Sequence, residues 1–422
     1  MHTMVDRVYM CIDLKSFYAS VECVERGLDP MKTRLVVADP DRTEKTICLA
    51  ITPAMKALGV KNRCRVFEIP PGIDYIMATP RMALYIQYSV KVYSVYLKYA
   101  ASKDIHVYSI DEVFMDVTDY LSYRNQTPQE FAEMILKDVM DTVGITATCG
   151  IGTNLYLAKI AMDIIAKHTP GNIGILNEES YREKLWRHTP LTDFWRIGTG
   201  TVRRLSSIGI ENMRDIALAN EDILYKHFGI DAELLIDHAW GRESVKMEDI
   251  KAYKPRSTSL SSGQVLPRGY AYEEGRIIVR EMAEGLGLEM FEQGYSTNLI
   301  TMSLGYSYAS GREQSRGSMR IGGYTASIKK LADSVAELYE RIRDRNVPVH
   351  KVNICYCNLS TDDVQQYDMF SQPEDQEKQI KLQSAMLNIR KKHGKNGIFK
   401  CMDLMEGATM LERNRQIGGH RA

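Results

Sequence analysis

The sequence of 422 residues has no apolar run near the roughly 18 residues that a membrane-spanning helix needs. Residues 1–7 lack a basic region followed by an apolar segment, so no secretion signal is expected. None of the eight cysteines forms a CxxC pair, which argues against a zinc site and a disulfide framework. We therefore expect a cytoplasmic protein in a reducing compartment, with no membrane as a partner.

A net positive charge is also lacking, because 54 Lys and Arg balance 54 Asp and Glu. A nucleic-acid-binding protein of this composition must therefore segregate its charges, with basic residues gathered where phosphates bind. Such a bias exists at the end of the chain, where residues 381–422 hold nine Lys or Arg against three acids. Composition alone thus leaves nucleic-acid binding open.

The first 170 residues predict an α/β core. Residues 8–14 form an apolar run that ends in an acid, which indicates a buried strand, and residues 16–25 have helical spacing. Further strands and helices alternate, with strands at 47–51, 105–110, 113–117 and 146–151 and helices at 54–58, 81–100, 128–143 and 155–168. The strands 105–110 and 113–117 should form an antiparallel hairpin at the centre of this core.

Beyond residue 170 the pattern changes twice. Short helices separated by glycines come first, and the polar, aperiodic stretch 242–257 is expected to be a linker. A second α/β unit follows in the order β-α-β-β-α-β, with elements at 257–266, 273–293, 297–308, 314–323, 325–345 and 350–358. An acidic, Gln-rich segment and a basic helix at 377–393 complete the chain, and the role of residues 394–422 stays open.

Three acids stand where apolar strands end. Asp13 closes the first strand, and Asp111 with Glu112 forms the turn of the predicted hairpin. A carboxylate beside a buried strand is costly unless it is paired or metal-bound. Carboxylate oxygens that converge from two strands suit a pair of Mg²⁺ ions about 4 Å apart. By itself the Asp-Glu pair would more simply cap a hairpin, and Asp13 is what favours a metal site.

The residues around these acids resemble a known family. Residues 13–22, DLKSFYASVE, and residues 109–112, SIDE, resemble the two metal-site motifs of Y-family translesion DNA polymerases. Residues 150–159, GIGTNLYLAK, resemble the third signature of that family. The resemblance runs from the first strand to about residue 358, and it is greatest to the UmuC-type SOS polymerases of bacteria.

This resemblance implies a right-hand polymerase. It places the palm at 1–18 and 80–168 and the fingers at 19–79. A helical thumb with a helix-hairpin-helix turn would occupy 169–241. The β-α-β-β-α-β unit, residues 258–359, would be the little finger domain, followed by a flexible tail at 360–422 that carries a clamp-binding motif.

The resemblance also assigns roles to residues. Asp13, Asp111 and Glu112, with the carbonyl of Leu14, would hold two Mg²⁺ ions, for which Mn²⁺ can substitute, and would act in catalysis. The nucleotide would be bound by Phe17, Tyr18, Lys56 and Lys159. Tyr18 matches the steric gate that excludes a ribose 2′-hydroxyl, and Lys159 matches a lysine that contacts the triphosphate.

The chain departs from the family pattern at two places. Where many members grip the triphosphate with a Tyr and an Arg, this chain has Pro53 and Lys56. Proline lacks the hydroxyl, and lysine offers a point charge rather than a bidentate fork. Lys15 stands where some relatives carry a second acid, so this position cannot bind a metal ion. Lys56 is therefore the residue of this stretch that we expect to contact the triphosphate.

The expected partners are primer–template DNA, a dNTP, a sliding clamp and SOS accessory proteins. Gly198 and Gly200 resemble a helix-hairpin-helix turn whose backbone N–H groups approach a phosphate, and Arg203 and Arg204 add charge one turn later. Arg316, on a strand of the second α/β unit, suits a DNA backbone contact without base readout. The segment from 366 to 370 resembles the bacterial clamp-binding pentapeptide, with Gln366 fixing the register and Met369 and Phe370 as apolar anchors.

The sequence therefore predicts a two-metal DNA polymerase that copies damaged template during an SOS response. Two alternatives from other classes stay open. One is a DNA-binding factor that docks at the clamp and displaces other polymerases, although it would not need Tyr18 or the three acids. The other is a palm-type nucleotide cyclase, which would need neither a hairpin thumb nor a clamp peptide.

Overall fold

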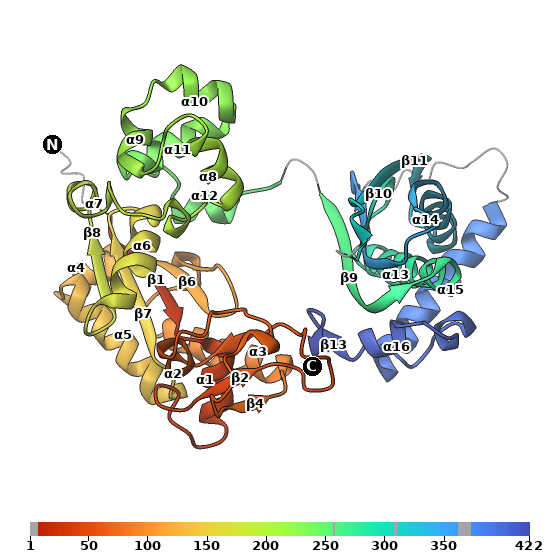
Figure 1. The fold of residues 1–422 in the computed structure, drawn as a ribbon, viewed down its shortest axis with the longest axis horizontal. Coiled ribbons are helices and arrows are strands. Elements are labelled where there is room, and N and C mark those ends of the chain that lie inside the picture. Colours follow the sequence, from red (N-terminus) through yellow and green to blue (C-terminus); the bar gives the residue numbers. More distant parts are fainter. Residues whose placement is uncertain (1–6, 256–257, 308–309, 362–372) are drawn as a thin grey trace. The chain divides into compact units, whose positions relative to one another are not determined.

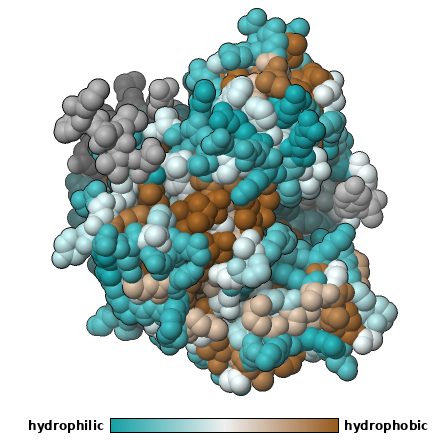
Figure 2. Space-filling model, turned by 90° about the vertical axis from the view of Figure 1, so that its left-hand side faces the viewer, coloured by the Kyte–Doolittle hydropathy of each residue, from teal (hydrophilic) through white to brown (hydrophobic). Residues whose placement is uncertain are grey.

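The computed structural model describes residues 7–422 except 256–257, 308–309 and 362–372. The chain divides into two compact units, residues 1–253 and 254–421, and each is described by itself (Figure 1). Among the described residues, no helix is both long and apolar enough to span a membrane. On the face drawn in Figure 2, hydrophilic side chains surround a central hydrophobic patch.

A five-stranded sheet forms the centre of the first unit. Its order is β5 (Ile105–Val107), β6 (Glu112–Asp116), β1 (Tyr9–Leu14), β7 (Ala147–Gly152) and β8 (Ile173–Leu176). β1 is antiparallel to both β6 and β7, whereas β7 and β8 are parallel. The predicted hairpin is confirmed as β5–β6, although it lies toward one edge and β1 takes the centre.

Alternate residues of β1 pack on opposite faces of this sheet. Met10, Ile12 and Leu14 belong to a core cluster that includes residues of α1 (Phe17–Val24), α3 (Met82–Tyr96) and α5 (Pro128–Val143). Tyr9 and Cys11 belong to a second cluster, against α6 (Leu155–Ile160) and the π-turn Ala161–Ile165 that continues it. The alternation puts Asp13 on the second face, the side of α6.

Two glycines of β7 allow α6 to lie directly on the sheet. A Cβ at Gly150 would stand 2.1 Å from the carbonyl oxygen of Ala158 and 2.2 Å from the nitrogen of Met162. A Cβ at Gly152 would stand 2.3 Å from the nitrogen of Ala158. Any side chain at these positions would push the helix away, so the glycines set the distance between α6 and the end of β1.

A smaller sheet precedes α3 in the chain. It has the order β3 (Ala50–Ile51), β2 (Leu35–Val37) and β4 (Ile76–Ala78), and it packs with α2 (Pro53–Ala57) and the 3₁₀ turn Val66–Glu68 around a separate small core. The strands β2 and β4 were not predicted. Each has only three residues, which is too short for a periodic pattern.

The rest of the first unit is mainly helical. Its helices are α4 (Thr118–Arg124), α7 (Glu178–Leu185), α8 (Thr199–Ser206), α9 (Met213–Leu218), α10 (Glu221–Phe228) and α11 (Asp231–Trp240). The strand β8 was expected to belong to the helical thumb but joins the large sheet. Short 3₁₀ turns at Ser102–Asp104, Ala166–His168 and Leu191–Asp193 connect these elements.

The stretch 242–257 was predicted as an aperiodic linker, and the structure differs. Residues Met247–Ala252 form helix α12. Met247 is buried in the cluster that contains Tyr9, and Lys251 Nζ donates to the carbonyl oxygen of Ile105 at 2.6 Å. A six-residue helix with one buried methionine shows no helical period, so it could not be predicted from the sequence pattern.

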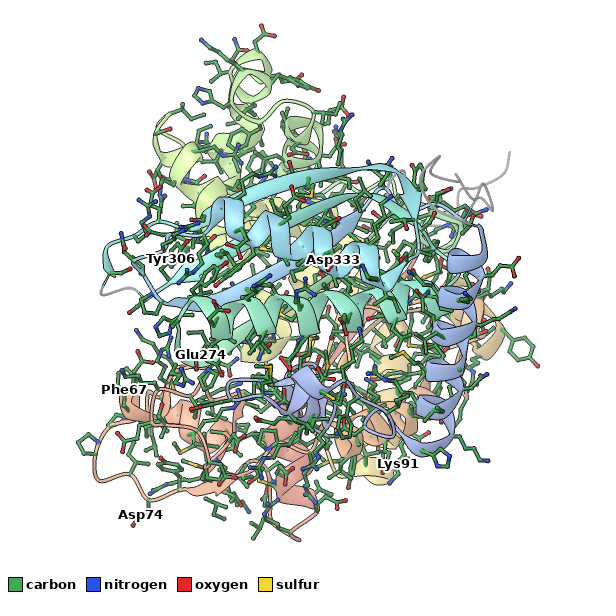
Figure 3. The ribbon with its side chains drawn as sticks, turned by 90° about the vertical axis from the view of Figure 1, so that its right-hand side faces the viewer. Phe67, Asp74, Lys91, Glu274, Tyr306 and Asp333 are labelled. Carbon is green, nitrogen blue, oxygen red and sulfur yellow. The ribbon has the colours of Figure 1, made fainter. Side chains whose placement is uncertain are left out.

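The second unit confirms the β-α-β-β-α-β prediction. Its elements are β9 (Ser259–Tyr270), α13 (Tyr272–Glu292), β10 (Thr297–Tyr306), β11 (Ser315–Thr325), α14 (Ile328–Ile342) and β12 (Val349–Cys357). The strand order is β11-β10-β12-β9, all antiparallel, and the two helices pack on one face. Arg280 of α13 donates a hydrogen bond to Asp333 of α14 at 2.9 Å. Asp333 is labelled in Figure 3.

The tail predicted as flexible from residue 360 is ordered over much of its length. It contains α15 (Pro373–His393), a 3₁₀ turn (Cys401–Leu404), α16 (Met410–Arg413) and the short hairpin of β13 (Gln416–Ile417) and β14 (His420–Arg421). The carboxylate of Glu281, 1% exposed, accepts from the backbone nitrogens of Thr409 at 2.9 Å and Met410 at 2.8 Å. Glu281 of α13 therefore holds the segment around Thr409 and Met410 in place. A contact between residues so far apart in the chain leaves no local sequence pattern.

Candidate active site

Two of the predicted acids lie directly opposite each other. Asp13 of β1 pairs in register with Glu112 of β6, and the nitrogen of Leu14 donates to the carbonyl oxygen of Asp111 at 3.0 Å. Directly opposed residues of an antiparallel pair project to the same face, and like charges there are destabilising. Asp111 stands at the adjoining turn, where the Ser109 hydroxyl donates to its carboxylate at 2.6 Å.

Two lysines neutralise these acids through a shared aspartate. Lys159 Nζ lies 2.7 Å from Glu112 Oε1 and 3.0 Å from Asp163 Oδ2. Lys167 Nζ lies 2.8 Å from Asp163 Oδ1 and 3.8 Å from Asp13 Oδ2. The result is an alternating chain of charges that runs from Glu112 to Asp13.

Lys159, predicted to contact the triphosphate, is buried beside two acids. It is only 7% exposed, in contact with Glu112 and Asp163 rather than turned to solvent. Burial lowers the pKa of Lys159, but the negative charges of Asp163 and Glu112 raise it more, so this pKa stands above its ordinary value. The lysine is therefore a fixed cation beside one of the predicted metal ligands.

Burial raises the pKa of Asp13 to about 7. The negative charges of Asp111 and Glu112 raise this pKa further, while Lys167 opposes the shift. Burial is the largest cause of this shift, and a bound cation would favour the ionised form of Asp13.

The donor set fits divalent metal ions. Asp13, Asp111 and Glu112 offer only oxygen atoms, which Mg²⁺ prefers. In the described part of the chain no three His, Cys, Asp or Glu side chains surround one point, and Glu112 Oε1 instead contacts Lys159 and the Cys11 thiol at 3.2 Å. A metal ion bound to Glu112 Oε1 would have to replace these contacts.

Three lysines, Lys15, Lys56 and Lys167, lie near Asp13. Burial lowers the pKa of Lys56, the charges of Lys167 and Lys15 lower it further, and Asp13 raises it. These four groups are therefore within electrostatic range of one another. Lys15 Nζ also donates to Asn172 Oδ1 at 2.5 Å. Neither Lys15 nor Lys167 was predicted as a site residue. Lys167 could have been found from the sequence, because residues 159, 163 and 167 are spaced so that they fall on one face of a helix.

The two predicted aromatic residues have different environments. Phe17 is 3% exposed and belongs to the core, and its role in nucleotide binding stays a prediction. The half-buried ring of Tyr18 stacks on Tyr85 with centroids 4.6 Å apart. Burial raises the pKa of Tyr18, and the charge of Asp111 raises it further, which places the Tyr18 hydroxyl near the acidic cluster.

The predicted hairpin turn begins α8. Gly198 is the residue before the helix, and both Gly198 and Gly200 are exposed, with open space where a Cβ would stand. Their backbone N–H groups are therefore accessible to a phosphate. Arg203 is exposed one turn later, whereas the neighbouring Arg204 covers the ring of Phe228 at 4.5 Å.

The second unit presents a polar sheet face opposite its helices. Cross-strand rows on this face join Arg316 with Ser303 and Asn353, and Arg320 with Leu299 and Cys357. Both arginines are exposed. The predicted clamp-binding residues Gln366, Met369 and Phe370 lie outside the described residues.

The chain is similar to known proteins over most of its length. Residues 12–163 match the impB/mucB/samB family, and residues 257–369 match the C-terminal domain of that family. The chain is 30% identical over 98% of its length to a putative UV-damage repair protein, UvrX, of Bacillus subtilis strain 168, covering 97% of that protein. The chain belongs to the Y family of DNA polymerases.

This Y-family polymerase is also similar to a second curated protein and to a solved structure. It is 28% identical to DNA polymerase IV 2 of Bacillus subtilis strain 168, over 99% of both chains. It matches the structure of a Y-family chimera of Dbh and Dpo4 with a TM-score of 0.66 and 22% identity, over 84% of this chain and all of the other. These relatives support the family and its fold, but not specifically the UmuC-type branch that the sequence predicted.

Proposed function

We propose that this polymerase adds deoxynucleotides to a primer along damaged template DNA, which is translesion synthesis. One observation carries the proposal. Asp13 and Glu112 are paired across the centre of the large sheet, Asp111 adjoins them, and lysines lie on the side of Asp13. Acids gathered at one point with cations beside them suit a reaction in which a triphosphate is bound and pyrophosphate leaves.

Asp13, Asp111, Glu112 and the Leu14 carbonyl would hold two Mg²⁺ ions, or Mn²⁺ in their place. Such ions supply Lewis acidity at the primer 3′-hydroxyl and neutralise charge on the triphosphate. The oxygen-only donors support this assignment, because Mg²⁺ prefers oxygen ligands.

The triphosphate is assigned to Lys56 and Lys167. Both are close to Asp13, and Lys167 is 38% exposed at its side chain, so it can turn to a ligand. Lys159 instead keeps Glu112 neutralised and in place. Positive point charges on this side of the acids balance the triphosphate without the bidentate arginine of many relatives.

Tyr18 is assigned as the steric gate. Its half-buried ring lies near Asp111, so the sugar of a nucleotide bound at the acids would rest against it. A flat ring at this point leaves no room for a 2′-hydroxyl.

DNA contacts are assigned to backbone and charge rather than to base edges. The exposed N-terminus of α8, with Gly198, Gly200 and Arg203, would bind a phosphate. The polar sheet face with Arg316 would bind backbone in the second unit. Clamp binding through residues 366–370, and an SOS role with accessory proteins in the manner of the UmuC-type branch, remain predictions from the sequence.

The test is primer extension on undamaged and lesion-bearing templates. We expect wild-type protein to extend both with Mg²⁺ or Mn²⁺ and to stop when the metal is chelated. Asp111→Ala should abolish extension while it retains affinity for primer–template DNA. If wild-type protein adds no nucleotide with either ion, the proposed function is wrong.

A further inference from the structure

The contact between α1 and α3 is built on a buried carboxylate. Glu22 lies one helical turn after Tyr18 on α1 and is 0% exposed. It accepts hydrogen bonds from Arg81 Nε at 3.0 Å and Arg81 Nη2 at 2.7 Å, and also from Arg26. Burial alone would raise the pKa of Glu22, but these bonds lower it below its ordinary value, so the carboxylate is charged. A buried charge with several partners fixes the geometry around it.

Tyr85 connects this carboxylate to the Tyr18 ring. Its hydroxyl donates to Glu22 Oε1 at 2.7 Å, and the whole side chain is buried. Its ring stacks on Tyr18 with centroids 4.6 Å apart and planes 21° apart. One end of Tyr85 is therefore held by Glu22, and its face supports Tyr18 from behind.

We propose that Tyr85, anchored by Glu22, is a positioning residue that determines how strictly Tyr18 excludes ribonucleotides. This inference rests on the proposed role of Tyr18 as the steric gate. A gate excludes a hydroxyl only if its ring cannot move back, because a shift of less than an atomic diameter admits one more oxygen. The Tyr85 ring occupies the space into which Tyr18 would retreat.

The chain offers a matched control on the same helix. Tyr88 lies three residues after Tyr85 and is also buried, and its hydroxyl donates to Glu25 Oε1 at 2.7 Å. It too joins α3 to the carboxylate that follows α1, but the Tyr18 ring stacks on Tyr85. Tyr88→Leu therefore removes an equivalent tyrosine–glutamate bond without removing the support of the gate.

The experiment measures kcat/KM for a dNTP and for the matching rNTP in wild type, Tyr85→Leu, Tyr88→Leu, Tyr18→Ala and the double variant of Tyr18 and Tyr85. We expect Tyr85→Leu to reduce discrimination against the rNTP about tenfold, which corresponds to about 1.4 kcal/mol. Tyr88→Leu should leave the discrimination ratio unchanged. In the Tyr18→Ala background, Tyr85→Leu should have no further effect, because the residue acts only through Tyr18.

Each contrary outcome has a separate meaning. Equal discrimination in Tyr85→Leu and wild type, with Tyr18→Ala admitting ribonucleotides, overturns this inference and leaves the gate intact. If Tyr18→Ala still rejects ribonucleotides, the gate assignment itself fails. Should Tyr85→Leu not fold, Tyr85→Phe decides, because it keeps the ring and loses only the anchor. A twofold or greater loss of discrimination in Tyr85→Phe is the expected result, and no loss refutes the role of the anchor.

Discussion

The Lys159→Met variant tests whether Lys159 stabilises the protein through its ion pair with Glu112, as the structure indicates, or binds the triphosphate, as the sequence predicts. Lys159 and Glu112 form a buried ion pair at 2.7 Å, with side chains 9% and 10% exposed. Removing one member of such a pair leaves an uncompensated buried charge, which costs about 3–5 kcal/mol. Asp163 keeps Lys167 at 2.8 Å, so we expect the lower end, about 3 kcal/mol.

Urea unfolding of the metal-free protein measures this loss, with Lys167→Met as the control. Lys167 is 38% exposed, and an ion pair of this exposure contributes about 1 kcal/mol or less. Added Mg²⁺ should restore part of the stability of Lys159→Met, because a cation at the acids neutralises the same carboxylate. If Lys159→Met is as stable as wild type but its KM for dNTP rises, Lys159 serves the triphosphate and the ion-pair account is wrong.

Three further predictions concern other parts of the chain. Because the pKa of Glu22 is lowered, its stabilisation is present above about pH 4.5 and is lost as pH falls through its folded pKa; Glu22→Gln should therefore unfold in urea with less pH dependence below 4.5 than wild type. Gly200→Ala has room for its Cβ and should keep its melting temperature while losing DNA affinity, and Arg203→Ala should reduce the salt slope of binding by about 1; unchanged affinity in both excludes this site. Glu281→Ala leaves two backbone donors unpaired and should destabilise the second unit by about 2–3 kcal/mol, with faster proteolysis of residues 394–422. Proteolysis at the wild-type rate would contradict the proposal that Glu281 holds this segment in place.

The large sheet and the acids could be predicted because their signals are local. The apolar run that ends at Asp13 and the apolar residues that follow Glu112 describe buried strands without reference to the rest of the chain. The β-α-β-β-α-β part of the second unit has long strands and helices, and its order was predicted for the same reason. Long periodic segments carry their own evidence.

What the sequence did not reveal depends on distant contacts. The helix that carries Lys159 was predicted, but the ion-pair partner of Lys159 was not. Lys159 lies against Glu112 because α6 approaches Gly150 and Gly152 closely. The polar segment 394–422 was left without a role, because Glu281 lies 128 residues before the first nitrogen that it binds. Such contacts have no local pattern.

The central claim is that Asp13, Asp111 and Glu112 carry out nucleotide addition. Single-turnover incorporation of one dNTP opposite a template lesion by Glu112→Gln tests it most directly, because the amide oxygen can still accept from Lys159 while the negative charge is lost. We predict a rate at least about 100-fold below wild type, with unchanged affinity for primer–template DNA. A rate within a few-fold of wild type would contradict the account.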